Sequence, residues 1–179
     1  MTADDVVGAL DRLDAAGLWY CVEGGWGVDA LLGEQTRPHD DLDLAVRFED
    51  VEAVSAAFPE LGRDDAEWPS SFVLSDEGGR KLDCHPLELD ADGDGWQPSR
   101  HGDAYRWPAG HLDARGSIGG RDVRCIDAEL QLRWHRYEGL DDVDWEDMRR
   151  LCDRFRLPVP PHLERRPGFL APKRSQRLR

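Results

Sequence analysis

The hydrophobic and polar positions of the chain follow two periods, which together predict helices packed against a sheet. Apolar residues spaced three and four apart, the period of a helix with one buried face, recur near the N-terminus and in the last third of the chain. Short apolar runs bounded by glycine or acidic residues predict strands between them. The predicted helices run from Thr2 to a stop at Gly17 and over residues 26–32, 49–58, 128–137 and 141–155. The predicted strands cover residues 18–23, 41–47, 71–74 and 80–85, with irregular loops and short strands over 90–120.

Some of these boundaries depend on the chemistry of helix ends. Thr2 followed by Asp5 is typical of a capping box, and Gly17 is a common residue at a helix C-terminus. Asp127 predicts the N-cap of the helix that follows it. The last helix is expected to bury a face made of Val143, Met148, Leu151, Cys152 and Phe155. The order of elements predicts an α+β fold, in which helices flank a small mixed sheet and a helical part follows.

The composition limits the classes of protein and the kinds of partner that fit this chain. A length of 179 residues, 40% of them hydrophobic and 34% charged, suits one well-solvated globular domain. The net charge of -14 argues against nucleic acid as a partner, because phosphates would be repelled. No apolar run approaches the roughly 20 residues that span a bilayer, and no signal segment opens the chain, so we expect no membrane partner. The cysteines are far apart in apolar surroundings, which predicts buried free thiols in a reducing cytoplasm. They are Cys21, Cys84, Cys125 and Cys152.

Acidic residues interrupt two of the predicted strands. Asp41 and Asp43 flank Leu42, so on a strand they share one face, about 6–7 Å apart, while the leucine points into the core. Paired anions repel each other unless a cation neutralises them, so the pair is costly for stability alone. Asp83 repeats the apolar, acidic, apolar pattern on a strand that could lie beside the first. Three such carboxylates are suited to one or two Mg²⁺ ions.

Two glycines before the short helix supply a second part of the candidate site. Gly24 and Gly25 lack Cβ, so the backbone can come close to a phosphate group. The helix that follows directs free N–H groups and its positive dipole end to the same point. Metal ions held by carboxylates can bridge the oxygens of a nucleotide triphosphate. The combination predicts nucleotidyl transfer, in which a substrate hydroxyl attacks the α-phosphorus and pyrophosphate leaves.

These motifs resemble the signature of the DNA polymerase β-like nucleotidyltransferases. The surrounding residues resemble its antibiotic-modifying branch, the lincosamide nucleotidyltransferases and aminoglycoside 2''-adenylyltransferases, and the lincosamide type most. The similarity covers most of residues 5–160. The residues that carry it are Gly24, Gly25, Trp26, Asp29, Leu32, Gly33, Thr36, Arg37, His39, Asp41, Leu42, Asp43, Asp83 and His85, with weaker matches at 63–65, 72–74, 116–118, 125–126 and 151–155.

The resemblance implies a role for each candidate residue. Asp41 and Asp43 would bind metal, and Asp83 would be the base for the acceptor hydroxyl, a metal ligand, or both. The triphosphate of ATP or another NTP would contact Gly24, Gly25, Arg37 and Arg133, where Arg133 replaces the lysine usual in the lincosamide type. His85 would contact the acceptor or be structural, and Glu88 is assigned to the acceptor from charge alone. Arg37 could equally brace Asp29 or the acidic pair.

The order of the predicted elements and the basic C-terminal residues divide the chain into three parts. We expect a nucleotidyltransferase domain over residues 1–120, a C-terminal helical segment over 121–160 and a basic, flexible tail over 161–179. The expected reaction is Mg²⁺-dependent transfer of AMP from ATP to a small molecule, such as a lincosamide or an aminoglycoside. The alternatives are adenylylation of a partner protein and a non-catalytic nucleotide-binding relic. A homodimer is compatible with the sequence.

Overall fold

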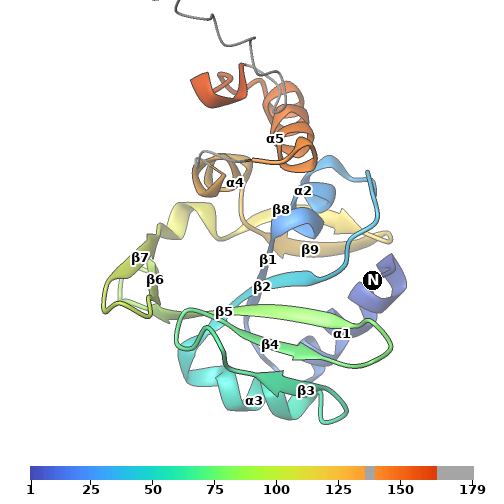
Figure 1. Cartoon of the computed structure of the whole chain (residues 1–179), viewed down its shortest axis with the longest axis vertical. Coiled ribbons are helices and arrows are strands. Elements are labelled where there is room, and N and C mark those ends of the chain that lie inside the picture. Colours follow the sequence, from blue (N-terminus) through green and yellow to red (C-terminus); the bar gives the residue numbers. More distant parts are fainter. Residues whose placement is uncertain (136–139, 165–179) are drawn as a thin grey trace, which may run out of the picture.

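A computed structural model describes residues 1–135 and 140–164 of the chain. One mixed sheet forms its centre, with the strand order β3-β4-β5-β2-β1-β9-β8, and a hairpin of β6 and β7 extends from the end of β5 (Figure 1). The strands are β1 (Tyr20–Glu23), β2 (Leu42–Arg47), β3 (Gly62–Asp64), β4 (Phe72–Ser75), β5 (Lys81–Leu89), β6 (Gly95–Pro98), β7 (Ala104–Trp107), β8 (Ala114–Ile118) and β9 (Arg121–Cys125). The expected mixed sheet flanked by helices is confirmed.

The helices begin and end close to the positions predicted from the sequence. The α-helices are α1 (Ala3–Ala15), α2 (Gly24–Leu32), α3 (Val51–Ala57), α4 (Ala128–Trp134) and α5 (Asp142–Phe155), and the short 3-10 helices are η1 (Phe48–Asp50), η2 (Ala109–His111) and η3 (Pro161–Leu163). Thr2 and Asp5 form the predicted capping box at the start of α1. Asp127 caps α4 by accepting a hydrogen bond from the Leu130 backbone N–H. Helix α2 begins at Gly24, two residues before the predicted start, and ends at Gly33 in a left-handed conformation.

The two faces of the sheet are covered by different elements. On one face, α1 and α3 pack apolar side chains against the strands in the largest core cluster, and Leu10, Leu44 and Val54 are fully buried there. On the other face, α4 covers a second cluster that includes Cys21, Ala45 and Leu130. A third cluster joins α2, α4, α5 and η3. Figure 1 shows α3 on one side of the sheet, and α4 and α5 on the opposite side. The face under α4 is the one that carries the acidic residues.

Some expectations need correction in detail. Val143 and Phe155 are exposed on α5, whereas Met148, Leu151 and Cys152 form its buried face as predicted. Residues 121–125 form strand β9 within the sheet, so the helical part starts at α4. The expected end of the α4 helix at residue 137 and nearly all of the basic tail, from residue 165, lie outside the described residues. All four cysteines are buried free thiols, as predicted.

Within residues 1–135 and 140–164, the structure contains no helix with the length and hydropathy needed to cross a membrane.

Candidate active site

A row of three carboxylates crosses three neighbouring strands of the sheet. Asp43 on β2 is the direct partner of Asp83 on the parallel strand β5, and of Glu23 on the antiparallel strand β1. Paired residues on adjacent strands point to the same face, and the strands lie about 4.8 Å apart. The sheet therefore brings Asp43 and Asp83, which are 40 positions apart in the sequence, side by side on one face. Glu23 was not predicted as a site residue; it occupies the last position of β1, directly before the glycines.

The acidic row concentrates negative charge in a partly buried place. Burial, the charges of Glu23 and Asp41, and to a lesser extent Asp83 raise the pKa of Asp43 to about 7, while His85 acts in the opposite direction. The neighbouring carboxylates thus make it more costly for Asp43 to be ionised. A positive group bound at Asp43 would relieve this cost.

Asp83 offers an unused ligand atom at the same place. Its Oδ1 is buried and has no hydrogen-bond partner, and His85 Nε2 lies 3.7 Å from it. A buried carboxylate oxygen without a partner is expensive, so such an atom marks a position where a ligand completes the site. The oxygen donors of Asp43 and Asp83 are of the type that Mg²⁺ prefers. These two residues therefore fit a divalent cation.

The third predicted metal ligand, Asp41, lies just before β2 and makes a different contact. Its Oδ2 accepts a hydrogen bond of 2.8 Å from Lys81 Nζ, on the strand that also carries Asp83. Among the described residues, no group of three or more His, Cys, Asp or Glu side chains is arranged to hold a metal ion. Asp41 thus pairs with Lys81 while its charge still acts on Asp43, and the joint role of the three aspartates as metal ligands stays a prediction.

His85 lies between two members of the row. Its Nδ1 is 2.8 Å from Glu23 Oε1, and its Nε2 faces Asp83. Burial acts to lower the pKa of His85, but the charges of Glu23, Asp83 and Asp43 outweigh it and raise that pKa to about 9. Glu23 therefore fixes the orientation of the imidazole ring next to the candidate base. The sequence left open whether His85 is structural or contacts the acceptor. Its position between Glu23 and Asp83 favours a role inside the site.

The two glycines form a tight turn against the acidic row. Gly24 has φ +58, and a Cβ at this position would lie 2.0 Å from Asp43 Oδ2. A Cβ on Gly25 would lie 2.4 Å from His39 Nδ1 and 2.8 Å from Arg37 Nη2. The carbonyl oxygen of Gly24 accepts a hydrogen bond of 3.1 Å from Gln131 Nε2 on α4. The N-terminus of α2 is thereby held directly beside Asp43, which only residues without a side chain permit.

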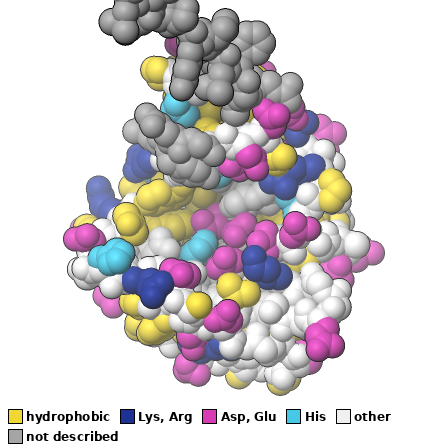
Figure 2. Space-filling model, viewed as in Figure 1, with side chains coloured by type: hydrophobic (Ala, Val, Ile, Leu, Met, Phe, Trp, Pro, Cys, Tyr) yellow, Lys and Arg dark blue, Asp and Glu magenta, His cyan; other side chains and the backbone are white. Residues whose placement is uncertain are grey.

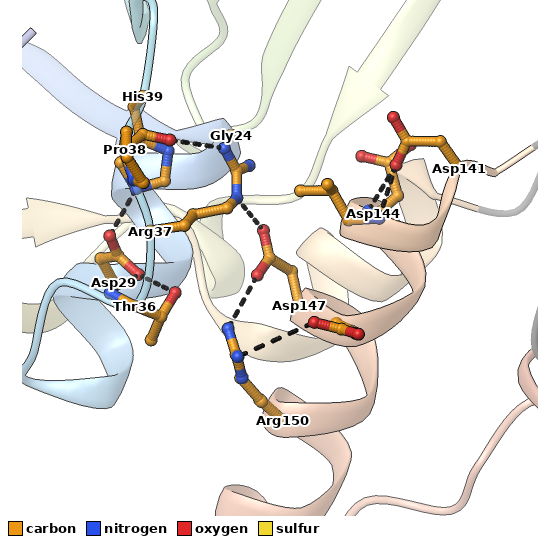
Figure 3. A network of polar contacts seen from close by, with 12 residues as sticks. Gly24, Asp29, Thr36, Arg37, Pro38, His39, Asp141, Asp144, Asp147 and Arg150 are labelled. Atoms are coloured by element: carbon orange, nitrogen blue, oxygen red, sulfur yellow. Dashed lines mark hydrogen bonds and ion pairs between the residues drawn. The ribbon is translucent and has the colours of Figure 1, made fainter.

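The loop after α2 is tied down by a polar network (Figure 3). Asp29 accepts hydrogen bonds from the backbone N–H and the hydroxyl of Thr36, and its second oxygen contacts His39 Nε2. Arg37 donates from Nε to Asp147 Oδ2 on α5 at 3.0 Å. The brace made by Arg37 therefore reaches α5, a partner that the sequence did not suggest. Asp29 thus holds the loop through Thr36 and His39.

The pair of Arg37 and Asp147 gives a first testable prediction. Asp147 is buried, and burial raises its pKa although Arg37 opposes this. We expect Arg37→Met to destabilise the protein by about 1–3 kcal/mol, at the lower end because Arg37 is partly exposed, since a buried carboxylate loses its main partner. Urea unfolding measures the effect. Asp147→Asn added to Arg37→Met should recover most of the loss; a double variant as unstable as the sum of both single variants would contradict the pairing.

Two of the predicted ligand contacts lie away from the acidic row. Arg133 is exposed on α4 and lines a pocket with Leu132 and residues 157–161, two positions from Gln131, which faces Gly24. Residues two apart on a helix lie on different faces, so the structure does not bring Arg133 to the glycine turn. Glu88 is exposed near Arg47 in another pocket and, at an odd spacing from Asp83, belongs to the other face of β5. Neither residue joins the site in this conformation.

This fold and site define a nucleotidyltransferase. The family model described as aminoglycoside-2''-adenylyltransferase matches residues 5–151, and the chain belongs to this family. A lincosamide resistance protein of Staphylococcus haemolyticus is 29% identical over 153 residues, which are 84% of this chain and 94% of that protein. A 2''-aminoglycoside nucleotidyltransferase of Klebsiella pneumoniae is 33% identical over 141 residues, 76% of this chain and 75% of that one.

Solved structures agree with this assignment. The lincomycin-bound lincosamide antibiotic adenylyltransferase LnuA superposes with a TM-score of 0.76 at 28% identity, covering 84% of this chain and 96% of that chain. ANT(2'')-Ia in complex with adenylyl-2''-tobramycin gives a TM-score of 0.66 at 25% identity, covering 86% and 88%. The resemblance inferred from the sequence is confirmed, and membership implies a nucleoside triphosphate donor and a divalent metal ion.

Proposed function

We propose that the protein transfers AMP from ATP to a hydroxyl group of an antibiotic of the lincosamide or aminoglycoside type, with Mg²⁺ as the metal and pyrophosphate as the second product. The observation that carries the proposal is the row of Glu23, Asp43 and Asp83 beside the glycine turn. Among the described residues, its three carboxylates pair with only one cationic side chain, His85, and Asp83 Oδ1 lacks a hydrogen-bond partner, which is what a site for a metal–triphosphate complex needs.

The chain's own residues are assigned as follows. Asp43 and Asp41 would hold the cation, which would supply positive charge to offset the charge of the phosphate oxygens. The backbone of Gly24 and Gly25 and the N-terminus of α2 receive the triphosphate. The acceptor hydroxyl oxygen forms a bond to the α-phosphorus as the bond to the bridging oxygen breaks. Asp83 would be a further ligand of that cation, and its carboxylate takes the hydroxyl proton.

The experiment that tests this is a transfer assay with defined acceptors. The protein is mixed with ATP, Mg²⁺ and either lincomycin or tobramycin, and pyrophosphate release is followed together with the mass of the antibiotic. A mass increase of one adenylyl group on an antibiotic supports the proposal. Labelling of an added protein would favour the alternative of protein adenylylation, and binding of ATP without turnover would favour a non-catalytic relic. Either of these outcomes overturns the proposed acceptor.

Removal of metal gives a separate prediction. Excess EDTA should lower the rate of adenylyl transfer at least about a hundredfold, because the charge of the triphosphate would face the acidic row without compensation. Addition of Mg²⁺ beyond the chelator should restore the rate. The fold should survive EDTA, since packing and not metal holds the sheet together. A far-UV CD spectrum recorded in both states checks this, and full activity in EDTA would contradict the assignment of Asp43.

A further inference from the structure

A line of aromatic side chains lies next to the acidic row and is not used by the proposed chemistry. Tyr105 packs edge-on against Trp134 with ring centroids 6.2 Å apart. Trp134 in turn lies 5.3 Å from Trp107, and Trp107 lies 6.5 Å from the ring of His85. We call Tyr105, Trp107 and Trp134 the aromatic wall. It starts on the β6–β7 hairpin and α4, and it ends at His85, two residues from Asp83 on β5.

The hairpin presents this wall on one of its two faces. Tyr105 and Trp107 are two residues apart on β7 and therefore point to the same side, while Trp96 on β6 pairs with Arg106 and points to the other side. Gly95 is the partner of Trp107, and a Cβ on Gly95 would lie 2.8 Å from Leu87 Cδ1 and 3.3 Å from Trp107 Cβ. The missing side chain lets Trp107 pack deep against the sheet.

The aromatic wall is buried at its inner end and accessible at its outer end. Trp107 is only 2% exposed, whereas Tyr105 is 51% exposed although it is a large aromatic residue. Figure 2 shows hydrophobic side chains gathered in a hollow between the β6–β7 hairpin and α4, directly beside a patch of acidic side chains. An exposed aromatic ring that packs against another ring at the edge of a site is a typical contact surface for a ligand.

We propose that the aromatic wall is the acceptor-binding surface of this active site, and that it selects an acceptor with an apolar ring and a single basic amine, the chemistry of a lincosamide, over a polycationic aminoglycoside. The inference deepens the proposed function and rests on it. A ligand on the exposed outer part of the wall at Tyr105 lies above the line of rings that leads through the buried Trp107 to His85, so its hydroxyl is on the side of Asp83, the candidate base.

The selectivity follows from the chemistry of the wall. Aromatic faces bind apolar rings and the C–H faces of sugars, and one ammonium group gains further from a cation–π contact. An aminoglycoside carries several ammonium groups, and each one placed against this surface would lose water without gaining a carboxylate partner. The carboxylates Glu23, Asp43 and Asp83 lie at one end of the wall, where the metal and the phosphates are bound.

Binding measurements on matched variants test the inference without ATP. Equilibrium dialysis with lincomycin and with tobramycin is carried out on the unaltered protein and on three variants: Tyr105→Ala, Tyr105→Phe and Trp96→Ala. We expect Tyr105→Ala to weaken lincomycin binding at least about tenfold, because it removes the accessible ring. Tyr105→Phe keeps the ring and should stay within about threefold, and Trp96→Ala, on the opposite face of the same hairpin, within about twofold. Lincomycin should bind the unaltered protein more tightly than tobramycin does.

Transfer assays on the same proteins distinguish a failure of the proposed binding surface from a failure of the proposed reaction. Unchanged lincomycin binding in Tyr105→Ala, an equal loss in Trp96→Ala, or tighter binding of tobramycin than of lincomycin would each overturn the inference. If lincomycin is still adenylylated in those cases, the proposed function stands without it. Lincomycin binding that depends on Tyr105, with no transfer to any acceptor, would instead overturn the proposed function and leave the binding surface intact. The KM for ATP should be equal in all variants, which excludes general damage to the fold.

Discussion

Asp43→Asn is expected to lower adenylyl transfer at least about a hundredfold, because the neutral amide removes the carboxylate that lies at the centre of the acidic row. The same change should stabilise the metal-free protein. Burial and the charges of Glu23 and Asp41 already raise the pKa of Asp43 to about 7, so its ionised form is disfavoured in the folded chain. An isosteric amide keeps the shape and removes the repulsion. A gain on the order of 1 kcal/mol would raise Tm by about 3 °C.

The two readouts together distinguish a functional carboxylate from a structural one. A residue kept for stability would lose both activity and Tm when changed, whereas a functional residue that is locally unfavourable loses only activity. Asp40→Asn is the matched control, since Asp40 is exposed three positions before Asp43 and should change neither quantity. Steady-state kinetics and thermal unfolding in EDTA measure the effects. Near-normal turnover in Asp43→Asn, or a marked drop in its Tm, would contradict the role given to Asp43.

Much of the fold could be predicted because local signals and long-range packing agree. The capping box at Thr2, the N-cap at Asp127 and the terminal Gly33 each mark a helix end through contacts with near neighbours, and the structure forms all three. The strands over 90–120 were harder to assign, because glycine, aspartate and proline weaken the local signal, yet β6, β7 and β8 form there. Pairing between distant strands supplies their stability, and a local pattern does not contain it.

The site could be predicted where alternation alone fixes the face of a strand. Asp43 and Asp83 each follow an apolar residue on a buried strand, and their pairing in register brings them together. Glu23 was missed, although its place before the glycines was a usable signal, because the sequence does not state that β1 pairs with β2. The Asp147 partner of Arg37 comes from α5, 110 positions away, and only packing of α5 against α2 creates that contact. Interactions of this range depend on the tertiary fold.

Arg133 and Glu88 lie away from the acidic row for a different reason. Arg133 was assigned through the resemblance to a basic position on a helix, but Gln131 is the residue of α4 that contacts the glycine turn. A shift of two residues on a helix changes the face by about half a turn, so an assignment by sequence position alone is sensitive to small errors. Glu88 was assigned to the acceptor from its charge alone, and charge does not determine which face of β5 a residue occupies. Contacts with the nucleotide from α4 therefore remain a prediction to be tested by mutation.

Gly24→Ala is expected to have the second large effect and to act through Asp43. The Cβ of alanine would lie 2.0 Å from Asp43 Oδ2, a distance that real Cβ contacts do not show, and the atom it meets belongs to a short, partly buried side chain. Asp43 or the start of α2 must therefore move. The left-handed φ of +58 adds strain of about 1–2 kcal/mol for a residue with a Cβ. We expect adenylyl transfer to fall at least about a hundredfold, since an error of 1 Å in positioning can have that effect.

Gly33→Ala is the control that separates strain from collision. Gly33 ends the same helix with a left-handed φ of +80, but a Cβ there would meet nothing within 4 Å. Gly33→Ala should lose stability by about the strain alone, 1–2 kcal/mol, and keep its kcat. Urea unfolding and steady-state kinetics are measured on both variants. If Gly24→Ala lost no more activity than Gly33→Ala, the close approach of the glycine turn to Asp43 would not be needed for catalysis. The proposal that Gly24 and Gly25 bind the triphosphate would then be wrong.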